Sequence, residues 1–194
     1  MRNIIKEIFD RVVAFLGLII LWPVLLVVAI MIKIKMPEGP IIFKQKRVGK
    51  NAKIFTIFKF RTMSVSHSGS SVSVAGEARI TALGAKLRKY KIDELPELWN
   101  VLNGTMSFVG PRPDVPGYAD SLKGEDRKIL KLKPGITGPA SLKYANEEEI
   151  LSKIENPIEY NNKVIFPDKV KINLEYYEKH NIFLDLKYIF KTVF

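Results

Sequence analysis

The chain has 194 residues, which suits one domain with a sizeable hydrophobic core. Its formal net charge of +11 favours an anionic partner, such as a nucleic acid, a phosphate-rich ligand or an acidic membrane surface. The absence of cysteine excludes disulfides, cysteine nucleophiles and thiolate metal sites, and the presence of only two histidines argues against a histidine-rich metal centre.

Residues 12–32 form an apolar run of 21 residues without a charge, bounded by Arg11 and Lys33. As a straight helix the run would be roughly 32 Å long, which is enough for the hydrocarbon core of a membrane. It is longer than the apolar part of a signal peptide, and no cleavage site of small residues follows it. The run therefore predicts a membrane segment, with a buried helix of a soluble protein as the alternative.

Pro23 lies near the middle of this run and predicts a break, because proline lacks an amide donor and clashes with the preceding helical turn. Basic residues flank the run on both sides, and positive charge tends to stay on the cytoplasmic side of a membrane. A re-entrant helix–break–helix over residues 1–36 keeps both basic flanks on the cytoplasmic side. We expect a catalytic domain on the cytoplasmic face over residues 37–194. A kinked helix that spans the membrane is the alternative.

Residues 39–76 contain no acidic residue but seven lysines and arginines. Within them, stretches 41–43 and 54–58 predict strands that are joined by a turn at 49–51. This basic hairpin suits either an anionic lipid surface or a phosphate ligand. Residues 64–76 are rich in serine and glycine and predict a loop, which either closes over a ligand or links passively. His67 in this loop is assigned no role.

Residues 79–92 predict a basic amphipathic helix, since apolar residues recur on one face. Such a helix lies either on a membrane interface or against the protein core. It leads directly to two adjacent carboxylates, Asp93 and Glu94. Considered alone, Asp93 also fits a helix N-cap, with Pro96 in the first turn.

The second half of the chain carries weaker signals. Residues 113–132 are polar and predict partial helix, and 133–138 predict a turn whose amides and Lys133 could meet a phosphate, with an ordinary loop as the alternative. Three glutamates at 147–149 predict the solvated start of a helix. Apolar residues dominate 182–194 and predict an interfacial helix, with core packing as the alternative.

Five motifs occur in order along most of the chain and together resemble the bacterial sugar transferases. They are Phe-Lys-Phe-Arg-Thr-Met at 58–63, Asp-Glu-Leu-Pro at 93–96, Trp-Asn-Val-Leu-Asn-Gly at 99–104, Met-Ser-Phe-Val-Gly-Pro-Arg-Pro at 106–113 and Lys-Pro-Gly-Ile-Thr-Gly at 133–138. That family consists of monotopic phosphoglycosyl transferases, which move a phosphosugar from a nucleotide diphosphate sugar, usually a UDP-sugar, to polyprenyl phosphate. The resemblance implies the same re-entrant hairpin broken at Pro23, although relatives often carry serine where Trp22 stands.

The resemblance also implies catalytic roles for Asp93 and Glu94. Asp93 would be the nucleophile, in agreement with the lack of cysteine and with the ability of a carboxylate to form an acyl phosphate, and would carry a covalent phosphosugar. Glu94 would act as a metal ligand or accept a proton from the incoming lipid phosphate. Mg²⁺ usually binds through one or two carboxylates and substrate phosphates, so we expect Mg²⁺ at this pair.

Five cations are predicted to bind the phosphates of the substrate. Lys59 and Arg61 match a family motif, and Arg112 is held between two prolines, which restricts its guanidinium. Arg88 lies five residues before Asp93 and could instead contact a lipid headgroup. Lys133 opens the predicted turn at 133–138.

The resemblance therefore implies an α/β fold, in a small monotopic domain with a re-entrant hairpin and interfacial amphipathic helices. The implied products are polyprenyl (undecaprenyl) diphosphate sugar and UMP, made on the cytoplasmic face of a bacterial inner membrane in the first membrane step of glycan assembly. We expect a nucleotide sugar, polyprenyl phosphate and anionic lipid as partners, and no nucleic acid; a homodimer is left open.

Residues 139–146 depart from the family pattern, which leaves the identity of the transferred sugar open. The alternatives are a membrane-tethered basic scaffold or nucleic-acid-binding protein, and a phosphatidyl-type transferase.

Overall fold

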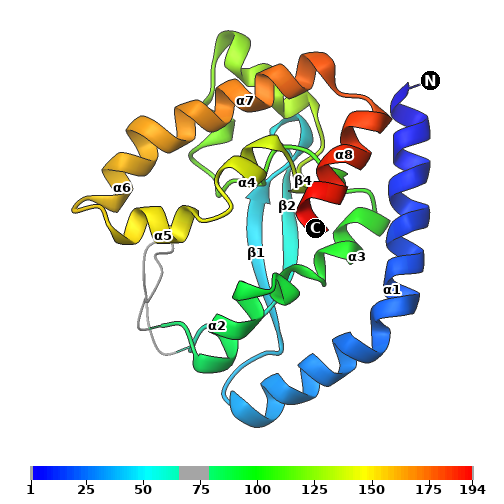
Figure 1. Ribbon diagram of the computed structural model, residues 1–194, viewed down its shortest axis with the longest axis vertical. Helices are drawn as coiled ribbons and strands as arrows, with labels where there is room; N and C mark the ends of the chain where they lie inside the picture. The colour runs from blue at the N-terminus through cyan, green and yellow to red at the C-terminus, as the bar shows by residue number, and fades with distance from the viewer. Residues whose placement is uncertain (1, 66–78, 194) are drawn as a thin grey trace.

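A computed structural model describes residues 2–65 and 79–193, which form a mixed α/β fold made mostly of helices (Figure 1). The expected fold class is confirmed in this coarse form. The helices are α1 (Arg2–Lys35), α2 (Ala82–Lys89), α3 (Glu97–Leu102), α4 (Pro139–Lys143), α5 (Glu147–Ser152), α6 (Pro157–Tyr160), α7 (Phe166–Lys179) and α8 (Ile182–Val193). The strands are β1 (Ile42–Val48), β2 (Ile54–Phe60), β3 (Ser107–Val109) and β4 (Gly135–Thr137). Short 3-10 or π turns are η1 (Lys50–Ala52), η2 (Ile92–Glu94), η3 (Ala119–Ser121), η4 (Gly124–Lys131) and η5 (Asn161–Ile165).

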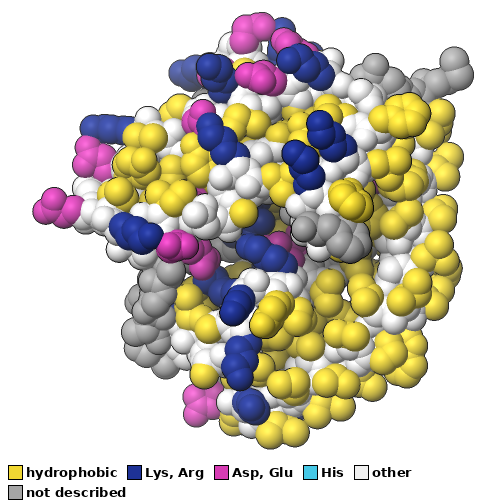
Figure 2. All heavy atoms as spheres, in the orientation of Figure 1, with side chains coloured by type: hydrophobic (Ala, Val, Ile, Leu, Met, Phe, Trp, Pro, Cys, Tyr) yellow, Lys and Arg dark blue, Asp and Glu magenta, His cyan; other side chains and the backbone are white. Residues whose placement is uncertain are grey.

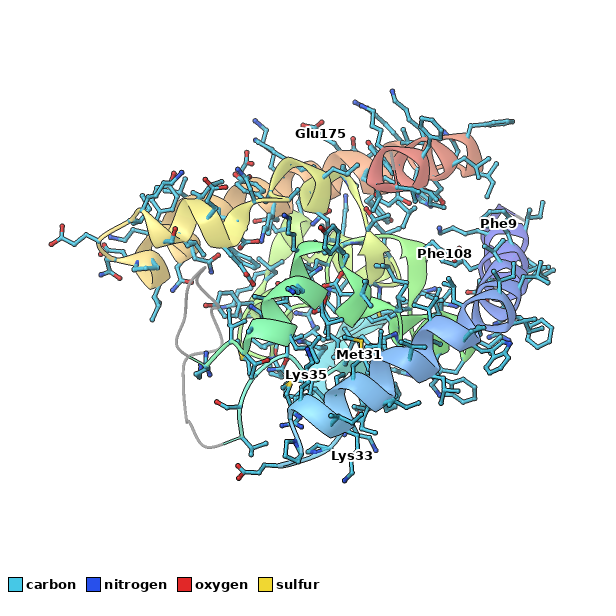
Figure 3. All side chains as sticks on the ribbon, turned by 60° about the horizontal axis from the view of Figure 1, so that its bottom comes forward. Phe9, Met31, Lys33, Lys35, Phe108 and Glu175 are labelled. Carbon is cyan, nitrogen blue, oxygen red and sulfur yellow. The ribbon has the colours of Figure 1, made fainter. Side chains whose placement is uncertain are left out.

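Helix α1 is continuous through Pro23, so the predicted break is a bend within one helix. Figure 1 shows its first half running along one edge of the molecule and its second half turning beneath the domain. Proline removes one intrahelical hydrogen bond, which makes such a bend easy. Figure 3 shows Phe9 near one end of the helix and Met31, Lys33 and Lys35 near the other.

Both ends of α1 contact the same globular part of the chain. Near the N-terminus, Lys6 Nζ lies 2.7 Å from Asp185 Oδ2 of α8, and Glu7 Oε1 lies 2.9 Å from Lys133 Nζ. Near the C-terminal end of α1, the fully buried Ile32 packs in a hydrophobic cluster with residues of β2 and α2. The domain therefore holds α1 at both ends.

The outer face of α1 is apolar and exposed. In the described part of the chain, α1 is the one helix long and apolar enough to cross a membrane, by length and composition. Only 11 % of its most apolar window is buried inside the protein, which argues against the alternative of a soluble core helix. The exposed side chains include Ile4, Ile8, Phe15, Ile19, Trp22, Leu26, Ile30 and Ile34. This surface indicates association with a membrane.

Strands β1 and β2 form the predicted hairpin, antiparallel and in register from Ile42 opposite Phe60 to Val48 opposite Ile54. Asn100 of α3 is fully buried against its edge, where its side chain accepts from Phe58 N at 3.1 Å and donates to Thr56 O at 2.8 Å. An amide side chain here satisfies one donor and one acceptor of the strand edge. This pair of bonds fixes the segment after Glu94 against β2.

The predicted turn at 133–138 is wrong in part, because its middle is strand β4. It pairs in parallel with β3, with Ser107 opposite Gly135 and Val109 opposite Thr137. A Cβ on Gly135 would lie 2.2 Å from Gly110 N, so the two motif segments approach as closely as glycine allows. The amide of Gly135 donates to Pro111 O at 2.8 Å. One of the amides that were predicted to meet a phosphate is therefore already hydrogen-bonded.

The predicted helix at 79–92 is shorter than expected. Helix α2 begins after Thr81, whose hydroxyl accepts from Gly84 N at 3.0 Å, and ends at Lys89. Lys91 then takes a left-handed conformation with φ of 55°, so the chain turns sharply before the carboxylate pair. Leu83 and Leu87 of α2 are buried in the core. The apolar face of this helix therefore meets the core.

In Figure 1, α5 and α6 lie on the side of the hairpin opposite α1, α7 crosses the top of the molecule, and α8 lies beside α1. A helix starts at the three glutamates as predicted, and α8 also forms as predicted. On α8, Asp185 is buried while Phe183 and Phe190 are exposed. The predicted loop at 64–76 lies almost entirely outside the described residues, as does His67.

Candidate active site

A cleft of about 1630 Å³ lies between the hairpin, α2 and η2 on one side and α4, α5 and α7 on the other. Figure 2 shows it as a hollow near the middle of one face, with Lys, Arg, Asp and Glu side chains in and around it. Both members of the carboxylate pair line it, together with Lys59, Arg88 and Arg112. The structure therefore brings together residues that are up to 53 positions apart in the chain.

Glu94 is the residue on which two of the cations converge. Lys59 Nζ lies 2.7 Å and Arg112 Nη2 lies 2.6 Å from the same oxygen, Glu94 Oε1. Burial favours the neutral acid, but Arg112 and Lys59 together outweigh it and hold the pKa of Glu94 well below its ordinary value. Glu94 is therefore ionised at neutral pH and a weak proton acceptor.

Asp93 has the opposite environment although it is the neighbouring residue. Its Oδ1 is buried and has no hydrogen-bond partner among the described residues. Burial, followed by the nearby charge of Glu94, raises the pKa of Asp93, while Lys59, Arg88 and Lys91 oppose this. A carboxylate with little stabilisation of its charge is more basic and a better nucleophile than a paired one. The two adjacent acids are thus suited to different roles.

Glu97 is a third acid of the site, and the sequence analysis missed it. Its side chain is 2 % exposed, and its Oε1 lies 3.0 Å from Lys59 Nζ without the alignment of a hydrogen bond. Burial raises the pKa of Glu97, and Glu94 adds to this while Lys59 opposes it. Its spacing from Glu94 is the one signal that the sequence offered, because residues three apart share a helical face.

Arg112 presents part of its guanidinium to the cleft. Its side chain is 41 % exposed although Nη2 is bonded to Glu94, and that carboxylate raises the pKa of Arg112. Arg88 also lines the cleft, where its Nε donates to Thr62 Oγ1 at 3.3 Å and its Nη1 lies 2.9 Å from Glu148 Oε1. Both arginines are placed where an anionic ligand could contact them.

Arg61 and Lys133 are placed differently. Arg61 lines the cleft, but its guanidinium donates to the backbone carbonyls of Met36, Glu38 and Pro40, which follow the end of α1. These bonds satisfy carbonyls that have no helical partner. Lys133 lies outside the cleft lining and pairs with α1. Phosphate binding by these two residues stays a prediction.

Two further charged residues of the cleft were not singled out from the sequence. Arg47 of β1 donates to Pro113 O at 3.1 Å and to Gln45 Oε1 at 2.6 Å. Burial raises the pKa of Asp114 to about 6, although Lys169 and Arg47 oppose the shift. Asp114 directly follows the Met-Ser-Phe-Val-Gly-Pro-Arg-Pro motif, which was its only sequence signal.

The model of the family described as bacterial sugar transferase matches residues 1–194. The chain belongs to this family. It is 38 % identical over 98 % of its length to a UDP-glucose:undecaprenyl-phosphate glucose-1-phosphate transferase of Klebsiella pneumoniae, and 35 % identical over its whole length to the protein of that name in Escherichia coli K12. It covers 40 % of each of these relatives.

A further relative is of similar size to the chain. The exopolysaccharide production protein PSS of Rhizobium leguminosarum is 35 % identical over the whole chain, which covers 95 % of that protein. The matched region thus makes up two fifths of some relatives and almost all of another.

Proposed function

We propose that the chain transfers a sugar 1-phosphate from a UDP-sugar to undecaprenyl phosphate and releases UMP. The names of the Klebsiella and Escherichia relatives support this donor and acceptor. The observation that carries the proposal is the contrast between Asp93 and Glu94. One is a buried carboxylate with a raised pKa and an unpartnered oxygen, and the other is held by two cations in the same cleft.

In the first step, a carboxylate oxygen of Asp93 attacks the β-phosphorus of the donor. The bond from that phosphorus to the oxygen bridging the two phosphates breaks, and UMP leaves with this oxygen and its electron pair. In the second step, an oxygen of polyprenyl phosphate attacks the same phosphorus, and Asp93 leaves as a carboxylate. Arg112 and Arg88 offset the charge on the phosphate oxygens in both steps.

Glu94 serves in this mechanism as a holder of cations. A carboxylate at this place could also accept a proton from the lipid phosphate, but two bonded cations make Glu94 a poor base. Its charge fixes Lys59 and Arg112, and so fixes the guanidinium that faces the cleft. This reading favours positioning and metal binding over proton transfer.

Asp93 and Glu94 also fit the donor set of Mg²⁺. In the described part of the chain no group of three or more His, Cys, Asp or Glu side chains could hold a metal ion, so substrate oxygens would complete the coordination. The unpartnered Oδ1 of Asp93 is an oxygen ligand of the right kind, and both cations on Glu94 contact only Oε1. Bound there, Mg²⁺ would offset the charge on the departing UMP.

For α1 we propose a re-entrant topology at the cytoplasmic face of the inner membrane. The bend of α1, which contains Pro23, and the contacts of both helix ends with one domain support it, because a straight spanning helix would carry one end across the membrane. Exposed Phe183 and Phe190 on α8, near Lys187 and Lys191, would meet the same anionic lipid surface.

A donor screen tests the proposed reaction. The full chain, in nanodiscs with Mg²⁺, is incubated with UDP-glucose, UDP-galactose or UDP-N-acetylgalactosamine, with and without undecaprenyl phosphate. We expect repeated turnover to UMP and a lipid-linked sugar only when the lipid is present. Release of UDP instead of UMP would indicate transfer of the sugar alone and would refute the proposal. Binding of a single-stranded oligonucleotide with no turnover of any donor would favour the nucleic-acid-binding alternative.

A further inference from the structure

Arg88 is engaged in the cleft by an acidic side chain from the opposite wall. Its Nη1 lies 2.9 Å from Glu148 Oε1, a residue of α5 that is 60 positions later in the chain. Both residues line the cleft, and their side chains are 22 % and 44 % exposed. In Figure 1, α5 lies above α2 on the left-hand side of the molecule. The ion pair therefore joins the two walls at a partly hydrated place.

The other two glutamates at the start of α5 show that this contact is specific. Glu147 also points to a cleft cation, with Oε2 2.6 Å from Lys169 Nζ of α7. Glu149 instead pairs with Lys153 one turn along α5, at 2.7 Å, with both side chains well exposed. The sequence predicted three solvated glutamates, whereas two of them form ion pairs with cations that line the cleft.

A carboxylate and a phosphate use the same donors of a guanidinium. A partly exposed ion pair is weak, and a diphosphate carries more negative charge than one carboxylate. The bond from Arg88 Nε to Thr62 Oγ1 does not involve Glu148, so it can hold the guanidinium in place when Glu148 moves away.

We propose that Glu148 competes with the diphosphate of the donor for the guanidinium of Arg88, so that donor binding displaces Glu148. The inference rests on the proposed function and names Glu148 as a residue that sets donor affinity. A ligand must bring enough charge to replace the carboxylate, so the exchange disfavours weakly charged anions.

The test measures the dissociation constant of UDP with Mg²⁺, by calorimetry on the full chain in nanodiscs. Glu148→Gln removes the competing charge and should tighten UDP binding about 2- to 5-fold, the range that a partly exposed ion pair spans. Glu149→Gln is the matched control, because it removes the same charge one residue away and should have a clearly smaller effect. In an Arg88→Ala background, Glu148→Gln should lose its effect, since the two changes act on one contact.

Three results would overturn the inference. They are weaker or unchanged UDP binding by Glu148→Gln, an equal gain from Glu149→Gln, and the same gain from Glu148→Gln with or without Arg88. The last two would show a general charge effect on the cleft. Any of these results in a protein that binds UDP would count against the inference alone. If the wild-type protein bound no UDP at all, the proposed function would fail as well.

Discussion

Lys59 of β2 and Glu94 of η2 form a salt bridge of 2.7 Å in which both side chains are largely buried. The same ammonium lies 3.0 Å from Glu97 Oε1, so one cation holds two carboxylates away from water. Buried charges of this kind are costly unless they are paired. The salt bridge therefore links the hairpin to the segment that carries the carboxylate pair.

Lys59→Met should destabilise the fold by about 3 to 5 kcal/mol, the usual loss when one partner of a buried ion pair is removed. Thermal unfolding in detergent measures the effect. Lys46→Met makes the same change at an exposed position of β1 and should have little effect. Adding Glu97→Gln to Lys59→Met should recover part of the stability at alkaline pH, because it removes a buried acid that would ionise there without its cation. No recovery would show that Lys59 stabilises the fold by packing alone.

Arg112→Lys should reduce turnover about 10- to 1000-fold although the charge is kept, since an ammonium cannot replace the planar fork of a guanidinium. Transfer to undecaprenyl phosphate is the measurement. Arg127→Lys is the control, because Arg127 donates only to surface carbonyls of Asp120 and Leu122 in the described contacts. Near-normal turnover by folded Arg112→Lys would leave Arg112 a structural role only.

The stability of the protein should depend on pH through Asp114, whose pKa is raised to about 6 from an ordinary value of 3.8. The folded state binds the proton of the Asp114 carboxyl group more tightly than the unfolded state does. Its contribution to the free energy of unfolding is therefore present below pH 3.8 and is lost as pH rises through about 6. The shift corresponds to at most about 3 kcal/mol. Asp114→Asn should therefore raise the melting temperature relative to wild type more at pH 7.5 than at pH 4.5. An equal difference at both pH values would contradict this assignment.

The sequence predicted those parts of the fold and site that depend on local pattern. The basic hairpin, the helix before Asp93 and the helix at the C-terminus follow from periodicity and turn residues. The convergence of Lys59 and Arg112 on the pair followed only from the motifs. Each motif is short, but their common occurrence in one chain implies a common site.

The parts that the sequence did not predict depend on contacts between distant segments. Strand β4 exists because Gly135 fits against Gly110, which no single segment reveals. The bonds from Arg61 to the carbonyls after the end of α1 also join distant segments, and phosphate binding by Arg61 stays a prediction. The burial of Glu97 and the inward orientation of Glu148 likewise follow from tertiary packing, which overrides local polarity.

The topology of α1 can be tested with single cysteines, since the chain contains none. Cysteines at Ile4, which is exposed, and at Lys50 should both be protected from an impermeant thiol reagent in intact cells. Both should react after permeabilisation, because a re-entrant helix keeps its ends on one side. Pro23→Leu restores the missing amide and should make the Ile4 site more reactive from outside. Labelling of the Ile4 site from outside in the unaltered helix would refute the re-entrant proposal.

Asp93→Asn should abolish both turnover and the covalent intermediate while leaving the fold intact, because the amide keeps the size of the side chain but is not a nucleophile. With donor and Mg²⁺ but no lipid, the wild-type protein should release at most about one UMP per enzyme in a burst. Mass spectrometry should find the phosphosugar on the peptide that contains Asp93.

Glu94→Gln is the informative companion to this variant. It removes the charge that holds Lys59 and Arg112, so turnover should fall, but some adduct should still form because the nucleophile is present. Adding the lipid to the isolated adduct should release it as lipid-linked sugar, and kinetics should be ping-pong. Direct transfer in a ternary complex predicts the opposite set of results: no adduct, no burst without lipid, and sequential kinetics. Those three results together would refute the role of Asp93 as nucleophile and would leave it as a metal ligand.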